Sequence, residues 1–159
     1  MADFDAKTTK GCTPFDPELI DKSSRGSGMI TQWTWDYGNG KVSNGQTPAY
    51  AYTSEGVYTI TLLIKDANGC QSDAIKKQYI TSNSAPQVIF SADKTTGCSK
   101  PFSVNFTNKS VGLKTGDQFE WDFGDGTNSG DKSPKKTFND TGNFSITLTI
   151  KSANGCNTS

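Results

Sequence analysis

The alternation of apolar and polar residues along the chain predicts β-strands and no long helices. Residues 144–150 (FSITLTI) alternate apolar and hydroxyl-bearing side chains, the period of a strand with one buried face. Phe119, Trp121 and Phe123 also stand two residues apart, so they fall on one face of an extended strand. The Gly-Asp-Gly that follows them suits the positive backbone angles of a tight turn, which predicts a core strand ending in a hairpin.

The same pattern occurs twice, at a fixed spacing. The sequence 33–40 (WTWDYGNG) matches 119–126 (FEWDFGDG), and three pairs of identical residues each differ in position by 86, namely Trp35 and Trp121, Cys12 and Cys98, and Cys70 and Cys156. A repeat of this length has the size of one immunoglobulin-like domain. We therefore expect an all-β chain of two tandem β-sandwiches, with a first domain at 1–82, a short polar linker at 83–86 and a second domain at 87–159.

Within each repeat the pattern predicts a similar order of strands. The first strands are expected at 3–6 and 89–92, followed by a polar loop at 7–13 and its counterpart. A second strand follows at 14–20 and, more regularly, at 101–107. Repeat 1 continues past Cys70 through residues 74–80, whereas repeat 2 stops at Ser159. We expect the second domain to lack its last strand and the chain to be a segment of a longer protein.

The motif Trp-Asp-Phe-Gly-Asp-Gly, with the Gly-x-aromatic strand at 142–150, resembles the signature of the polycystic kidney disease (PKD) domain. The resemblance covers nearly the whole chain twice, although repeat 1 has Tyr37 for Phe and Asn39 for Asp. It implies Ig-like β-sandwiches found in extracellular adhesins, filaments and secreted hydrolases. The paired Gly-Cys and Asn-Gly-Cys are similar to those of PKD repeats in very large secreted Bacteroidetes proteins. The signature residues are Trp35, Asp36, Gly38, Gly40, Trp121, Asp122, Gly124, Asp125 and Gly126.

Composition and charge narrow the classes of function. Sixteen basic and sixteen acidic residues give a formal net charge of zero, with no basic block, so we expect neither a nucleic-acid partner nor a membrane partner. Histidine is absent, which removes the usual general base and the commonest transition-metal ligand. We expect no catalytic residues and no cofactor, and therefore no enzyme.

Two constellations still suggest binding chemistry. Asp122 and Asp125 surround a tight turn and could form a Ca²⁺ loop. Alternatively, these carboxylates accept hydrogen bonds from turn amides, which we favour because Asn39 replaces Asp125 in the other repeat. The tryptophans could form a sugar-stacking platform, but their spacing puts them on the buried face of the strand. We expect no metal site and core packing for the tryptophans.

The four cysteines are the most informative chemistry. An even number of cysteines, at equivalent positions of the two repeats in a chain without histidine, indicates disulfides. It therefore also indicates an oxidising, extracellular or cell-surface compartment. Pairing within a repeat, Cys12 with Cys70 and Cys98 with Cys156, would join opposite ends of an Ig-like sandwich, roughly 25 Å apart, although a disulfide needs Cα atoms within about 7 Å. We therefore favour an interdomain pair of Cys12 with Cys156, with Cys70 and Cys98 pairing to neighbouring repeats.

Two classes of function fit this sequence. The first is a structural, load-bearing repeat of a large extracellular filament or adhesin, whose partners are neighbouring repeats and other copies in a multi-stranded appendage. The second is an accessory carbohydrate- or protein-binding module of a secreted hydrolase. The glycan or cell-surface target is not encoded in any recognisable motif of the sequence.

Overall fold

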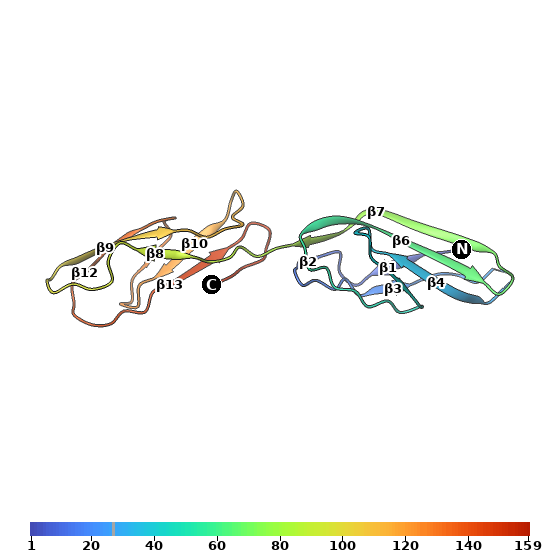
Figure 1. Ribbon diagram of the computed structural model, residues 1–159, viewed down its shortest axis with the longest axis horizontal. Coiled ribbons are helices and arrows are strands. Elements are labelled where there is room, and N and C mark those ends of the chain that lie inside the picture. The colour runs from blue at the N-terminus through green and yellow to red at the C-terminus, as the bar shows by residue number, and fades with distance from the viewer. Residues whose placement is uncertain (27) are drawn as a thin grey trace. The chain divides into compact units, whose positions relative to one another are not determined.

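The computed structural model describes residues 1–26 and 28–159, which form two compact units, Met1–Ser84 and Ala85–Ser159. Each unit is built from strands, and Figure 1 shows their order. The described residues contain no helix long and apolar enough to cross a membrane.

The first unit is a five-stranded sheet packed against a smaller one. The large sheet has the order β2-β7-β6-β4-β5, and β1 pairs with β3 in the small sheet. The long antiparallel hairpin of β6 and β7 lies in the large sheet (Figure 1). The strands are β1 (Phe4–Ala6), β2 (Lys10–Cys12), β3 (Leu19–Asp21), β4 (Ile30–Asp36), β5 (Val42–Asn44), β6 (Gly56–Asp66) and β7 (Gln71–Asn83).

The second unit has two three-stranded sheets, β12-β9-β8 and β11-β10-β13. Apolar side chains from both sheets form one core around Trp121, which is completely buried. The strands are β8 (Phe90–Ala92), β9 (Phe102–Asn108), β10 (Gln118–Asp122), β11 (Asn128–Ser129), β12 (Lys135–Phe138) and β13 (Thr147–Lys151).

The aromatic stripe of the repeated motif lies in the core, as its period of two predicts. Trp35 and Trp121 are fully buried, and Tyr37 and Phe123 are almost so. Each buried indole N–H is satisfied, since Trp35 donates to the Gly45 carbonyl at 3.0 Å and Trp121 to the Asp131 carbonyl at 2.9 Å. A sugar-stacking role is therefore excluded for these two side chains.

Three local predictions differ from the structure. The predicted strand at 14–20 forms only an isolated bridge at Phe15 and the short strand β3 from Leu19. The predicted polar loop at 7–13 contains strand β2, which pairs parallel with the end of β7. The predicted strand at 144–150 begins only at Thr147. In unit 1 the corresponding part of β6, residues 56–60, pairs with β7 and not with β4. Residues 144–146 are not in a strand because unit 2 has no counterpart of β7 beyond one bridge.

That bridge joins Ile150 and Thr158. Their backbone N–H and C=O groups exchange hydrogen bonds of 2.8 and 3.1 Å. In unit 1 the equivalent pair is Ile64 with Ser72, the second residue of β7. Thr158 of unit 2 therefore pairs with Ile150 in the same register in which Ser72 of β7 pairs with Ile64.

Candidate functional site

The repeated turns use their aspartates to hold the backbone. The Asp36 carboxylate accepts the Gly38 N–H at 2.8 Å, and the Asp122 carboxylate accepts the Gly124 N–H, also at 2.8 Å. Both glycines have positive φ, which an Asx turn of this shape requires. These carboxylates are therefore engaged by turn amides, as the sequence favoured over a Ca²⁺ loop.

The residue after the first glycine of each turn, Asn39 or Asp125, contacts a side chain that the sequence analysis missed. In unit 2 the Asp125 carboxylate pairs with the Lys136 ammonium at 2.6 Å and accepts the Thr127 hydroxyl at 2.6 Å. The hydrogen bond from Lys136 is the main reason that the pKa of Asp125 falls to about 2. In unit 1 the Asn39 amide donates instead to the Tyr50 hydroxyl at 2.8 Å.

These two contacts occupy equivalent positions, because 39 and 125, like 50 and 136, differ by 86. Tyr50 stacks on Tyr37 with ring centroids 4.1 Å apart, and the Lys136 ammonium lies 5.4 Å from the centroid of the Phe123 ring. The joint change of both partners between the repeats was visible in the sequence and could have revealed the contact. Asp125 is thus neutralised by a lysine in its own unit. The described residues hold no cluster of three or more metal-ligating side chains.

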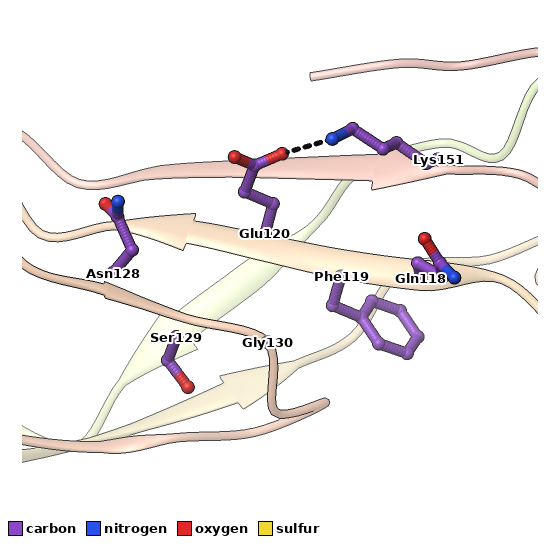
Figure 2. Close-up of a pocket in the computed structure, with 7 residues that line it drawn as sticks. All are labelled: Gln118, Phe119, Glu120, Asn128, Ser129, Gly130 and Lys151. Carbon is purple, nitrogen blue, oxygen red and sulfur yellow. Dashed lines mark ion pairs between the residues drawn. The ribbon is translucent and has the colours of Figure 1, made fainter.

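A shallow depression of about 310 Å³ lies on the sheet of unit 2. Figure 2 shows that the Glu120 carboxylate points toward the Lys151 ammonium, and the two are 2.8 Å apart. The other lining residues are Gln118, Phe119, Asn128, Ser129 and Gly130. Because its only charged groups neutralise each other at the surface, this depression offers no acid, base or nucleophile in a catalytic arrangement.

The cysteines divide into two kinds. Cys12 and Cys156 are each disulfide-bonded, whereas Cys70 and Cys98 are exposed free thiols. Neither of the pairs within one repeat is therefore formed.

In unit 1 the two cysteines lie at opposite ends of the large sheet. Cys12 ends β2 and is in register with Asn83, the last residue of β7. Cys70 directly precedes β7, in the turn where Gly69 donates to the Asp66 carbonyl at 3.0 Å. Since β7 has 13 residues, the two ends are about 40 Å apart. Cys12 thus lies where the chain leaves the unit, and Cys70 lies at the far end.

In unit 2 the equivalent cysteines lie at the equivalent ends. The turn before Cys156 is anchored by Asp117, whose carboxylate accepts the Ala153 N–H at 2.8 Å. Asp117 ends the loop that starts near Val111, and Val111 bridges to Gln87 at the start of the unit. Cys98 belongs to the segment before β9 at the other end. Cys156, buried behind this turn, therefore lies where the chain enters the unit.

A close approach fixes each Gly-Cys segment. A Cβ on Gly11 would lie 2.0 Å from the Phe15 ring, and one on Gly97 would lie 2.2 Å from the Phe102 ring. Any side chain at these glycines would displace the ring. The requirement for glycine next to Cys12 and Cys98 is thus a packing requirement.

Unit 2 also has a groove of about 660 Å³ at the end where Cys98 lies. Its floor includes Phe102, Phe144 and Ile146, which are partly exposed. Its rim carries Lys100 and Asp140, whose charged groups are 3.9 Å apart.

Two packed sheets of short strands around a buried tryptophan are typical of Ig-like β-sandwich domains, and both units have this architecture. Within that class, the profile of the PKD domain matches residues 1–81 and 83–159, so the chain belongs to the PKD domain family. PKD domains are non-catalytic modules, and the chain consists of two of them.

Relatives of known name contain similar modules. The chain is 37% identical over 67 residues to the pre-pro-metalloprotease PrtV of Vibrio cholerae and 36% identical over 52 residues to the collagenase ColQ1 of Bacillus cereus. These segments cover 41% and 33% of this chain but only 7% and 5% of the relatives. The crystal structure of the PKD1 domain of PrtV is 28% identical, with a TM-score of 0.45, and covers 52% of this chain and 94% of that one.

Proposed function

We propose that this chain is a structural, non-catalytic repeat segment of a large extracellular filament or adhesin, and that a disulfide between Cys12 and Cys156 fastens the junction between its two domains. The observation that carries the proposal is the position of the cysteines. Cys12 lies where the chain leaves the first unit, and Cys156 lies where it enters the second. Only Ser84 and the start of the second unit separate these two ends along the chain.

The free cysteines support the same arrangement for a longer array. Cys70 is equivalent to Cys156 and Cys98 is equivalent to Cys12, and both are exposed. In an array of such domains Cys70 would face the preceding repeat and Cys98 the following one. Each junction would then hold one disulfide, and a short linker that otherwise acts as a hinge would become stiff. Disulfides of this kind persist in an extracellular or cell-surface compartment.

Force measurements on single molecules test the load-bearing role. When the molecule is pulled from its ends, a bond between positions 12 and 156 removes 144 residues from the extensible chain, about 50 nm at about 3.5 Å per residue. We expect this extension to appear only after reduction or in Cys12→Ser. The matched control Cys70→Ser should keep the short extension. Equal extension of oxidised and reduced protein would refute the proposal, as would a peptide linking Cys12 to Cys70 in a non-reducing digest.

A second function is supported by the named relatives. Because the matched segments occur in a metalloprotease and in collagenases, the two domains could instead serve as an accessory module of a secreted hydrolase that binds carbohydrate or protein. Retention of the chain on immobilised collagen or on a polysaccharide, at the same strength after reduction, would favour this function. No retention on either material would favour the structural role.

A further inference from the structure

The chain contains four Asn-Gly pairs, the dipeptide in which an asparagine side chain reacts most easily with the backbone that follows it. The glycine nitrogen attacks the side-chain carbonyl, because glycine has no Cβ to block the approach. This nitrogen must lose its proton to react, so a hydrogen bond that holds the glycine N–H slows the reaction. The four pairs are Asn39-Gly40, Asn44-Gly45, Asn68-Gly69 and Asn154-Gly155.

The glycine N–H groups of these pairs differ in their hydrogen bonding. Gly45, Gly69 and Gly155 each donate to a backbone carbonyl, at 3.1, 3.0 and 2.9 Å. The Gly40 N–H donates to no acceptor among the residues that the structure describes. Asn39 and Gly40 are both exposed, and a Cβ on Gly40 would have nothing within 4 Å, so hydroxide and water reach this nitrogen. The attacking group is therefore available at Gly40.

The side chain of Asn39 is held by both of its polar atoms. Its Oδ1 accepts the Lys41 N–H at 3.2 Å, and its Nδ2 donates to the Tyr50 hydroxyl at 2.8 Å. A donor at Oδ1 stabilises the negative charge that this oxygen acquires when the carbonyl is attacked, as in an oxyanion hole. The Tyr50 hydroxyl lies next to the nitrogen that must leave, and stacking on Tyr37 holds its ring in place.

Asn154 is a matched internal comparison. Its Oδ1 also accepts an N–H two positions later, that of Cys156 at 2.9 Å, but the Gly155 N–H is held by a carbonyl. In the signature turn of unit 2, the Asp125 carboxylate has no amide to lose and is paired with Lys136. Within the described part of the chain, the held amide and the available nitrogen therefore occur together in the signature turn of unit 1.

We propose that Asn39 is a site of spontaneous deamidation, with Gly40 as the nucleophile and Tyr50 as the residue that donates a proton to the leaving nitrogen. Hydroxide removes the Gly40 amide proton, and this nitrogen bonds to Cγ of Asn39. The Cγ–Nδ2 bond then breaks, and ammonia leaves with a proton from Tyr50, which water restores. Water opens the resulting cyclic imide at either carbonyl and gives aspartate or isoaspartate. One water is consumed and one ammonia is released, with no change of oxidation state.

The product changes the turn between β4 and β5. A carboxylate at position 39 has no N–H to donate to Tyr50, and it adds a negative charge to unit 1. In unit 2 the equivalent carboxylate is paired with Lys136, but unit 1 has a phenol at that position. The isoaspartate product also lengthens the backbone of the turn by one carbon. Deamidation thus gives unit 1 a charge without the cation that balances it in unit 2.

Peptide mapping of the full chain after incubation in mildly alkaline buffer tests the site. Trypsin cleavage after Lys41, Lys65 and Lys151 places the four pairs in separate peptides, whose masses report loss of the amide. We expect Asn39 to react at least about fivefold faster than the other three asparagines, the factor that one backbone hydrogen bond of ordinary strength gives. In a denaturing concentration of urea the four rates should converge. A rate at Asn39 that does not exceed the other three in the folded chain would overturn the proposal, as would the same lead in urea.

Tyr50→Phe tests the proton donor, because it keeps the ring on Tyr37 and removes only the hydroxyl. The rate at Asn39 should fall by about tenfold, less than the typical effect of a general acid because this turn is exposed. The matched control is Tyr58→Phe, whose hydroxyl donates to the Ser54 carbonyl and should leave the rate unchanged. An unchanged or faster rate in Tyr50→Phe would overturn the role of Tyr50, as would an equal fall in the control.

Discussion

The two glycines of each signature turn have the same backbone requirement but different surroundings, which allows a matched test. Gly38 and Gly40 have φ values of 73° and 78°. A Cβ on Gly38 would lie 2.3 Å from the Thr59 carbonyl oxygen, whereas one on Gly40 would have nothing within 4 Å. Gly38→Ala and Gly40→Ala therefore share the backbone cost and differ only in the collision.

The size of the difference follows from these numbers. A left-handed conformation costs a non-glycine residue about 1–2 kcal/mol. The collision of Gly38→Ala is with backbone of β6 at a register shift between Tyr58 and Ile60, so it cannot be relieved by rotating a side chain. Forcing an extra carbon into packed structure adds about 1–3 kcal/mol. We expect Gly38→Ala to destabilise unit 1 by roughly 2–5 kcal/mol and Gly40→Ala by about 1–2 kcal/mol.

The stability of each unit must be measured separately, because a chain with two compact units is not described by a single two-state free energy of unfolding. Hydrogen exchange of the full chain in increasing urea gives the free energy of unfolding of each unit from its own peptides. Unit 2 offers a replicate, since a Cβ on Gly124 would lie 2.6 Å from the Ser145 carbonyl oxygen and one on Gly126 would have open space. Equal losses for the two substitutions within a turn would refute the steric argument.

Three further predictions concern polar contacts. Acid should destabilise unit 2 as the pH falls from about 4 towards 2, because folding lowers the pKa of Asp125 from 3.8 to about 2. The ionised carboxylate stabilises the folded state at pH values above 3.8, and this stabilisation is lost as the pH falls to the folded-state pKa. In urea unfolding, Asp125→Asn should lose less stability in acid than the wild type, and an identical loss would contradict this. Lys136→Met should remove part of that pH dependence while keeping the apolar stem over the Phe123 ring, and an unchanged acid profile would show that the ion pair is not its source. Tyr52→Phe should cost unit 1 about 1 kcal/mol, since the buried hydroxyl donates to the Tyr37 carbonyl at 2.9 Å; a stability equal to the wild type would show that this hydrogen bond has no net value.

Much of each unit was predictable because its information is local. The alternation around Trp35 and Trp121 identifies the core face, and the glycines after it identify the turn. The Asn-Gly pairs before Cys70 and Cys156 are also a local turn signal, and Gly69 and Gly155 have the positive φ of such a turn.

What the sequence did not predict depends on partners distant in the chain. Residues 144–146 have a perfect strand pattern, but alternation specifies which face is buried and not whether a neighbouring strand exists. The parallel pairing of residues 10–12 with β7 has no local signal, since Lys-Gly-Cys is an ordinary loop sequence. The pairing of Lys136 with Asp125 was missed because a lysine gives no local sign of its partner, and the signal in the sequence was the joint change of both positions between the repeats.

The exchange of Asn39 and Tyr50 for Asp125 and Lys136 has a consequence for how an array of these domains can grow. Tandem repeats gain and lose copies by unequal crossing-over between the repeated stretches of their coding sequence. A crossover inside the 11-residue interval from Asn39 to Tyr50 would create hybrids that join Asn to Lys, or Asp to Tyr. The second hybrid would leave a carboxylate beside a phenol ring stack without its cation. Crossovers outside this interval transfer the two residues together. Stable repeats should therefore carry either Asn with Tyr or Asp with Lys at these two positions.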